Sequence, residues 1–181
     1  SIKQLEDGHY QIASPWRVGR EKTRDEFAKL DSFTMAMGRM KSLKRKFEKN
    51  PRLMEGSFQQ MEETIALGHA RIITDLSAAE EAPVWYMPNL VVLHPDKPNK
   101  FRICQDAAAK VKGRSLNDFL LDGPDVMNRL VGVLLRFRKP EITLTGDIKN
   151  FFYQVRIDPL DRSAYRYLWW PDRTMDRSKI M

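Results

Sequence analysis

The chain is poor in the residues that build disulfide frameworks and zinc sites. Its 181 residues include one cysteine, Cys104, and three scattered histidines, His9, His69 and His94. One thiol cannot form an internal disulfide, and these histidines lack the spacing of zinc ligands. The two shortages exclude a disulfide-stapled module and a zinc finger, and they favour a reducing compartment.

Long apolar runs are also missing. No stretch approaches the roughly 20 consecutive apolar residues that a membrane-spanning helix needs. The opening residues, "SIKQLEDGHY", lack the apolar centre of a secretory signal. We therefore expect no membrane partner. Because the sequence starts with serine and stops at "RSKIM" without a recognisable end of a fold, we expect a piece of a longer polypeptide.

Positive charge is what the chain has in excess. The formal net charge is +7, while 42% of the residues are hydrophobic and 30% are charged, which suits a globular domain rather than a disordered chain. The length is that of about one domain. An excess of this sign favours a polyanionic partner such as nucleic acid or an anionic surface.

The first part of the chain predicts a linker followed by two helices. We expect residues 1–31 to form the linker, with a short extended segment near Pro15. Residues 32–69 predict a helical pair, which begins at Ser32 as N-cap, restarts at Pro51 and ends at Gly68. Its apolar stripes are Met37, Met40, Leu43 and Phe47, then Met54, Phe58, Met61 and Ile65.

The first of these helices carries a basic run. The segment "RMKSLKRKFEKNPR", residues 39–52, has seven basic side chains against one glutamate. Its centre, Lys44, Arg45 and Lys46, is a candidate nucleic-acid contact. A solvated helix face without a partner explains the run equally well.

Residues 70–181 predict short strands, turns and one helix. "ARIIT" (70–74) is a candidate strand, and "NLVVLH" (89–94) with "KFRICQD" (100–106) predict a hairpin around "PDKPN". A helix before Pro140, capped by Asp122 or Asp125, is expected to bury Leu130, Val131, Leu134 and Phe137. "EITLTGDI", "FYQVRID" and "YRYLWW" complete a strand-rich last third. Separate blocks of helices and antiparallel strands indicate an α+β fold.

One carboxylate, Asp147, interrupts the apolar run "EITLTGDIKNFFYQVRID", residues 141–158. Burying an unpaired carboxylate is costly, so Asp147 is exposed, paired or bound to a metal. It can cap the short helical turn that follows it. Alternatively it is a ligand for Mg²⁺ in two-metal phosphoryl transfer, a site that requires a second acid.

Several motifs follow one another in order along residues 85–172. They are "HPDKPNKFRICQDAAAKVKGRSLND", "LLDGPD", "GVLLRFR", the D-I-x-x-F-F-x-Q-V block that starts at Asp147, and "LWWPD". In this order they resemble the fingers and early palm of the reverse transcriptases of BEL/Pao-type long-terminal-repeat retrotransposons. "SPWR" and "SLKRKFEKNP" resemble the leader before that polymerase. The resemblance implies fingers over residues 70–140 and the start of a palm over 141–181.

The resemblance also implies roles for single residues. Asp147 matches the first catalytic aspartate, which binds two Mg²⁺ ions with help from the backbone carbonyl of Ile148. Phe152 matches the aromatic gate under the nucleotide sugar, where an apolar ring excludes a 2′-hydroxyl. Arg102 matches the arginine over the incoming nucleotide, whose phosphates a guanidinium can hold. From the residues alone, Phe152 could equally be a core aromatic, although Phe151 is the stronger candidate for the core. Arg102 could equally be a surface charge.

Further basic and aromatic residues receive weaker assignments. Lys97 and Lys100 lie where the family places a phosphate-binding lysine. Lys110, Lys112 and Arg114 are expected along a template strand, and Asp106 is expected to bond to local backbone. Trp169 and Trp170 either stack on template bases or divide into one packed and one surface ring.

Taken together, the resemblance implies the N-terminal part of an RNA-directed DNA polymerase. The expected partners are an RNA or DNA template–primer, deoxynucleoside triphosphates, and the rest of a polyprotein with palm, thumb, RNase H and integrase. We expect it in the cytoplasm, in retroelement particles or in the nucleus. The family's paired catalytic aspartates would lie beyond Met181, so residues 1–181 alone are predicted to be inactive. The alternatives are a catalytically dead remnant that only binds nucleic acid, and an unstable fragment whose unpaired sheet edges promote aggregation.

Overall fold

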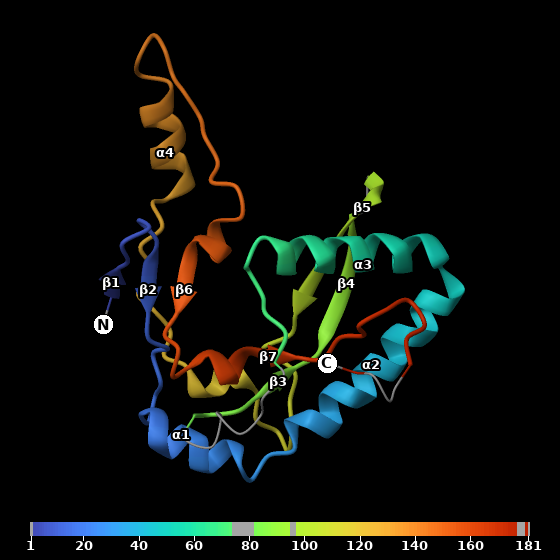
Figure 1. Ribbon diagram of the computed structural model, residues 1–181. Coiled ribbons are helices and arrows are strands. Elements are labelled where there is room, and N and C mark those ends of the chain that lie inside the picture. The colour runs from blue at the N-terminus through green and yellow to red at the C-terminus, as the bar shows by residue number, and fades with distance from the viewer. Residues whose placement is uncertain (1, 74–81, 95–96, 177–179, 181) are drawn as a thin grey trace.

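The computed structural model describes residues 2–73, 82–94, 97–176 and 180, with the side chains of 94–100 outside the description (Figure 1). It is a mixed structure of helices and small sheets, consistent with the expected α+β class. The helices are α1 (Arg20–Phe27), α2 (Ser32–Lys49), α3 (Pro51–Ala66) and α4 (Leu130–Phe137), and the strands are β1 (Ile2–Gln4), β2 (Tyr10–Ile12), β3 (Tyr86–Met87), β4 (Asn89–His94), β5 (Lys97–Gln105), β6 (Val155–Ile157) and β7 (Arg166–Tyr167). The described residues also contain three short 3₁₀ helices, η2 (Leu116–Phe119), η3 (Phe151–Gln154) and η4 (Arg162–Tyr165).

The predicted helical pair is confirmed as α2 and α3. The N-cap of α2 is Asp31 rather than Ser32, because the Asp31 carboxylate accepts the backbone N–H of Thr34 at 2.9 Å. The Ser32 hydroxyl instead accepts the N–H of Tyr86 at 3.1 Å and ties the helix to β3. Between the helices, the Asn50 side chain caps α3. Gly68 follows α3 with a positive φ of 72°, as expected of a C-terminal glycine.

The main core lies between the helical pair, the β4–β5 hairpin and the segment after β7. Phe47 is fully buried and contacts Phe58, Trp169 and Trp170. Both tryptophans are buried, so neither the expected surface ring nor the expected base-stacking platform is present. Two adjacent rings can both be buried because β7 ends at Tyr167, before the tryptophans, and the strand alternation does not continue through them.

The predicted hairpin is confirmed as β4 and β5. The two strands are antiparallel, with Leu90 opposite Cys104 and Val92 opposite Arg102. The hairpin packs on α2 and α3 (Figure 1). A Cβ atom on Gly56 of α3 would lie 2.3 Å from Phe101 Cζ, so only glycine permits this close approach of helix and strand.

The N-terminal region differs from the expected linker. Residues 1–31 contain β1, β2 and α1, and β2 pairs in parallel with β6 near the other end of the chain. Phe27 of α1 packs on Trp85 and Phe119, in a second core. The sequence pattern resembles a linker because both strands are only three residues long and because β6, the second partner of β2, is distant in sequence.

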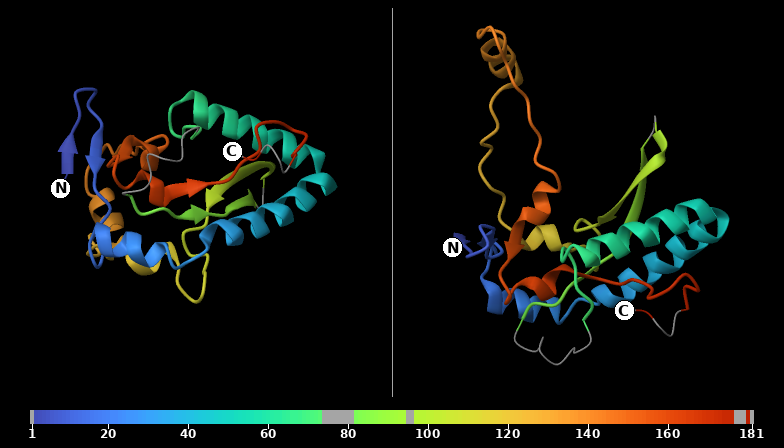
Figure 2. Two further views of the ribbon diagram at one scale, coloured as in Figure 1. Left: turned by 60° about the horizontal axis from the view of Figure 1, so that its bottom comes forward. Right: turned by 45° about the horizontal axis from the view of Figure 1, so that its top comes forward.

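The segment from residue 121 to 152 leaves this body as an arm that carries α4 (Figures 1 and 2). A helix was expected here, but its N-cap is Arg129 rather than Asp122 or Asp125. The predicted buried face is wrong, because no residue of α4 is buried. Residues 70–73 and 141–148 also form no strand. The apolar pattern is present in both segments, but a strand needs a hydrogen-bonding neighbour, and neither segment pairs with a strand that the structure describes.

Candidate nucleic-acid interface and the Asp147 segment

Asp147 lies in the irregular limb of the arm between α4 and η3, and it is exposed. The exposed position explains how the chain accommodates this carboxylate among apolar neighbours. The interpretation as a helix cap is wrong, since the N-cap of η3 is Asn150, in a left-handed conformation without a side-chain cap. Among the described residues, no group of three histidine, cysteine or acidic side chains could hold a metal ion.

The residues that follow Asp147 are open to solvent. Ile148 is 59% exposed, Phe151 52% and Phe152 89%, so the core interpretations of both phenylalanines are wrong. Tyr153 differs, because its ring stacks on His69 after α3, with centroids 4.4 Å apart and planes 4° apart. This contact fixes the point where the arm rejoins the body, while the gate role expected for Phe152 stays a prediction.

Arg102 is exposed on β5, as the surface interpretation expects. Lys97 and Lys100 also belong to β5, but their side chains lie outside the described part of the structure. In both Figure 1 and Figure 2 the hairpin and the arm stand apart. The described structure therefore does not bring Arg102 together with the Asp147 segment.

The expected template-binding cluster forms a tight turn. Lys112 and Gly113 both have positive φ, 48° and 80°, and Val111 and Arg114 exchange backbone hydrogen bonds of 2.7 and 3.0 Å. This is the geometry of a two-residue hairpin turn. Lys112 Nζ donates to the Lys29 carbonyl at 3.2 Å, and the Arg114 guanidinium lies 4.4 Å from the Phe119 ring centroid. Of the three residues, Lys110 is exposed without such a contact within the described residues.

Asp106 has the structural role expected of it. Its carboxylate accepts the N–H of Ala108 at 3.0 Å, and its own N–H donates to the Pro88 carbonyl at 2.9 Å. These bonds shape the loop that follows β5. The carboxylate is thus occupied by local backbone.

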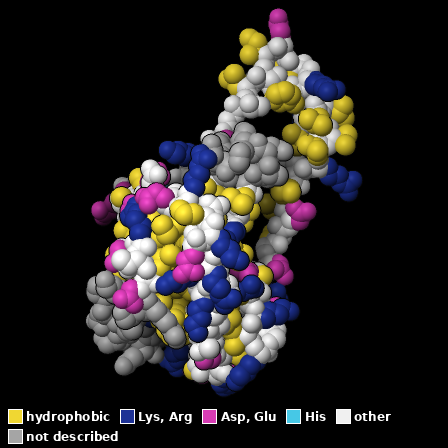
Figure 3. Space-filling model, turned by 90° about the vertical axis from the view of Figure 1, so that its right-hand side faces the viewer, with side chains coloured by type: hydrophobic (Ala, Val, Ile, Leu, Met, Phe, Trp, Pro, Cys, Tyr) yellow, Lys and Arg dark blue, Asp and Glu magenta, His cyan; other side chains and the backbone are white. Residues whose placement is uncertain are grey.

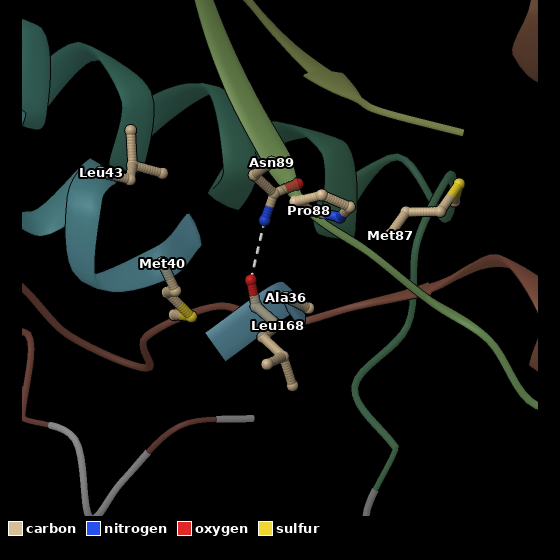
Figure 4. A pocket seen from close by; sticks show the side chains of 7 residues that line it. All are labelled: Ala36, Met40, Leu43, Met87, Pro88, Asn89 and Leu168. Atoms are coloured by element: carbon tan, nitrogen blue, oxygen red, sulfur yellow. Dashed lines mark hydrogen bonds between the residues drawn. The ribbon is translucent and has the colours of Figure 1, made fainter. Parts of the chain in front are cut away.

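Two hollows accompany these elements. One, of about 440 Å³, lies between α1 and the segment 114–119 and is lined by bases and acids together, including the Lys29–Glu26 ion pair at 2.7 Å. The other lies among apolar side chains of α2, β3 and β4, where Asn89 donates to the Leu168 carbonyl at 2.7 Å (Figure 4). It has no room for a water molecule. The first hollow is lined by both charges and the second has no space for a ligand. Neither hollow is therefore a distinct anion site.

The basic run of α2 divides into two groups. Lys44 Nζ donates to the Met175 carbonyl and Lys46 Nζ to the Val91 carbonyl, each at 3.0 Å, so both bind the helix to the body. Arg45 is exposed and stands four residues from the exposed Lys41 and Lys49. We call Lys41, Arg45 and Lys49 the α2 basic stripe, because residues four apart lie on one helix face. None of the three forms an ion pair with another residue that the structure describes.

Figure 3 views the side of the molecule where α2 and α3 meet and shows Lys and Arg side chains gathered on it. The sequence predicted this basic helix, and the predicted contact was its centre, Lys44 to Lys46. Helical periodicity separates the outward stripe from the two lysines that bond to the body. Which lysines bond to the body depends on the segments that pack beside α2, and these segments are distant in the sequence.

Asp161 forms a buried site that the sequence did not reveal. Its carboxylate accepts four hydrogen bonds: from Trp16 Nε1 at 2.9 Å, from Arg20 Nε and Nη2 at 2.7 and 3.1 Å, and from the Ser14 N–H at 2.8 Å. Burial, the largest effect, raises the pKa of Asp161, but these hydrogen bonds together outweigh it and hold the pKa below its usual value. The pKa of Arg20 is raised by its hydrogen bond to Asp161.

The Asp161 site is closed and structural. Its acceptors are occupied by groups of the same chain, and it joins the segment before α1 to the turn before η4. In the sequence, Asp161 looked like an ordinary turn residue of "IDPLDRSAY". No local signal could have identified it, since its partners lie more than 140 residues away.

Comparison with models of known families, with curated proteins and with solved structures finds no match for this chain. In the part of the chain that the structure describes, no helix is both long and apolar enough to span a bilayer.

Proposed function

We propose that this chain is the N-terminal part of a retroelement reverse transcriptase and that it holds nucleic acid through the α2 basic stripe. The observation that carries the binding role is the stripe itself: Lys41, Arg45 and Lys49 are exposed on one face and have no acidic partner among the described residues. The ordered motifs of residues 85–172 support the assignment to a polymerase.

The geometry of the stripe suits a phosphate backbone. Residues four apart on a helix are about 6 Å apart along its axis, so the stripe spans about 12 Å. Double-stranded DNA carries one negative charge per about 1.7 Å of its axis, and such contacts release counterions without reading sequence. The helix is held in place by Phe47 in the core and by Lys44 and Lys46 at its flanks. The stripe is therefore presented on a rigid support.

The proposed polymerase centre requires more than these residues. Mg²⁺ is usually held by one or two carboxylates with water and substrate phosphates, so Asp147 and the Ile148 carbonyl fit as part of such a shell. In the complete protein two Mg²⁺ ions would promote attack of a primer 3′-hydroxyl on the α-phosphate of a deoxynucleotide. Arg102 and Phe152, both exposed, would contact that nucleotide. Among the described residues no group of three histidine, cysteine or acidic side chains could hold a metal ion, so this chain alone is proposed to bind and not to polymerise.

The first experiment measures binding to a labelled RNA–DNA duplex by fluorescence anisotropy over a range of salt. Replacing Lys41, Arg45 and Lys49 together by alanine is expected to weaken binding at least tenfold. It should also reduce the slope of log K against log salt by about 2 to 3, since each phosphate contact contributes about 0.9. The matched control replaces three exposed bases of the arm, Arg136, Arg138 and Lys139.

Two results would contradict the proposal. Equal losses in the stripe variant and the arm variant would mean that only net charge matters. A binding affinity that does not change with salt concentration would exclude the proposed phosphate contacts. On the same preparations, Mg²⁺-dependent primer extension that Asp147→Asn abolishes would show that the chain polymerises after all.

A further inference from the structure

The larger hollow, between α1 and the segment 114–119, has the size of a small-molecule site. Its volume of about 440 Å³ lies within the range of about 300 to 1,000 Å³ that ligand pockets occupy. Hydrogen bonds tie its two sides together. The Arg17 N–H donates to the Phe119 carbonyl at 2.9 Å, and Lys112 Nζ donates to the Lys29 carbonyl at 3.2 Å. The shape of the hollow is therefore fixed by contacts within the chain.

One side of the hollow carries a flat cationic surface. The Arg114 guanidinium lies 4.4 Å from the centroid of the Phe119 ring, and this buried ring holds it in place. Arg114 is exposed and lines the hollow, so the guanidinium face turned away from Phe119 is available to a ligand. Planar guanidinium groups stack on nucleobases, as aromatic rings do. Val18, which also lines the hollow and is 49% exposed, adds an apolar contact for a ring.

The charged side chains of the hollow supply hydrogen-bond acceptors as well as donors. Glu26 Oε1 accepts from Lys29 at 2.7 Å, and Asp25 Oδ1 accepts from Arg24 at 3.2 Å. The second oxygen of each carboxylate has no hydrogen-bond donor among the described residues. The hydrogen bond from Lys29 lowers the pKa of Glu26, and the charge of Arg114 adds to this effect. Glu26 is therefore ionised at neutral pH and acts only as an acceptor.

We propose that this hollow binds one unpaired base of a single-stranded nucleic acid, stacked on Arg114 and hydrogen-bonded along its edge to Asp25 and Glu26. A nucleobase is planar and uncharged and carries donors and acceptors along its edges, so it suits a lining of mixed charge better than an anion does. The exposed Lys22 in the lining and the exposed Lys110 before the turn are cations suited to the flanking phosphates.

The strand is single because the bases of a duplex are paired and stacked and cannot enter a hollow of this kind. This inference goes beyond the proposed function. The α2 basic stripe contacts phosphates without reading sequence, whereas the hollow would contact a base.

The two carboxylates would also select the base. An ionised carboxylate only accepts hydrogen bonds. Cytosine and adenine carry an exocyclic amino group that donates to it, whereas uracil and thymine present a carbonyl oxygen at the corresponding position. We therefore expect the hollow to prefer cytosine or adenine over uracil.

Fluorescence anisotropy with two labelled RNA hexamers, oligo-C and oligo-U, tests this preference at one salt concentration. The two strands carry the same charge and rings of the same size, so phosphate contacts cancel in the ratio of their Kd values. The unaltered chain is expected to bind oligo-C about tenfold more tightly than oligo-U. Equal affinities would overturn the proposal.

Two variants of Arg114 separate stacking from charge. Arg114→Ala should weaken the binding of oligo-C about tenfold, because it removes the stacking surface for the base. Arg114→Lys keeps the charge but not the planar group, so it should lose nearly as much. Binding of oligo-C by the lysine variant as tight as by the unaltered chain would mean that only charge matters, and it would overturn the stacked arrangement. Circular dichroism checks that both variants keep the fold.

The double variant Asp25→Asn with Glu26→Gln tests the role of the acids. An amide offers donors as well as acceptors, so it accommodates uracil as well as cytosine. The ratio of the two Kd values should therefore fall from about tenfold to less than about twofold. A ratio that stays at the value of the unaltered chain would contradict the assignment of these two carboxylates.

The α2 basic stripe provides the matched control. Replacing Lys41, Arg45 and Lys49 by alanine should weaken the binding of both hexamers alike and leave the ratio of their Kd values unchanged. If this variant binds as tightly as the unaltered chain while the preference for oligo-C persists, the proposed function fails and the inference stands. If the stripe variant abolishes the preference, the base is read on α2 and the inference fails.

Discussion

The α2–α3 body and the arm are both built from helices with apolar side chains, yet their surroundings differ completely. In the body, Phe47 contacts Phe58 and both tryptophans and is fully buried. In the arm, Phe137 is 40% and Phe152 89% exposed. An apolar pattern therefore predicts where a helix will bury its face only when a partner surface is present in the same chain.

The sharpest test of this contrast replaces one phenylalanine in each region. Phe47→Ala is expected to lower the free energy of unfolding by about 3 to 5 kcal/mol, because it removes a large ring and leaves a cavity. Phe152→Ala should change it by less than about 0.5 kcal/mol, as is usual for exposed positions. Urea unfolding followed by tryptophan fluorescence measures both. Similar losses in the two variants would show that Phe152 is packed in solution.

The second test concerns the Asp161 site, which anchors the N-terminal region to the body. Asp161→Asn keeps the side-chain shape but leaves Arg20 without its buried counter-charge, and it should cost about 2 to 3 kcal/mol. The control is Asp158→Asn, whose carboxylate lies 3.8 Å from Arg20 Nη2 and is partly exposed. A smaller loss is expected there.

The Asp161 site also predicts a pH dependence. Because the folded pKa of Asp161 is lowered, its stabilisation is fully present above the unfolded pKa of about 3.9 and is lost as pH falls through the folded value. Thermal unfolding between about pH 6 and pH 2 should therefore show a steeper loss of stability in the unaltered chain than in Asp161→Asn. Parallel curves for the two proteins would contradict this assignment.

The smallest expected effects come from two glycine-to-alanine changes with opposite signs. In α3, Gly56→Ala forces its Cβ against the Phe101 ring and should cost about 1 to 3 kcal/mol of global stability. In α4, the nearest atom to a Cβ on Gly132 is Arg136 Nη1 at 3.4 Å, the end of a flexible side chain. Gly132→Ala should stabilise the helix locally by about 1 kcal/mol without changing global unfolding.

Hydrogen exchange of the α4 amides measures the local effect, and urea unfolding measures the global one. Slower exchange in α4 at an unchanged urea midpoint is the expected result for Gly132→Ala. A stabilising Gly56→Ala would instead mean that α3 and β5 are less closely packed than the distance to Phe101 implies.

The candidate site could be foreseen only in part. The sequence predicted a basic helix, which is present, and Arg102 is exposed, as its interpretation as a surface charge requires, while its nucleotide-binding role stays a prediction. The predicted nucleic-acid contacts were Lys44, Arg45 and Lys46. In the structure Lys44 and Lys46 donate to backbone carbonyls, and Arg45 is exposed together with Lys41 and Lys49. Charge can be counted from sequence, but the direction of each side chain depends on what packs beside the helix.

By itself, the sequence determined the local elements: the helical pair, the Pro51 restart, the Gly68 end and the β4–β5 hairpin. Caps, turns and periodic apolar stripes act within a few residues, so they can be read in order along the chain. Tertiary structure alone decided that Trp169 and Trp170 are both buried, that Asp161 meets Arg20, and that the segment around Asp147 is exposed. Those outcomes depend on which distant segments meet, and burial follows from such meetings rather than from the pattern of one segment.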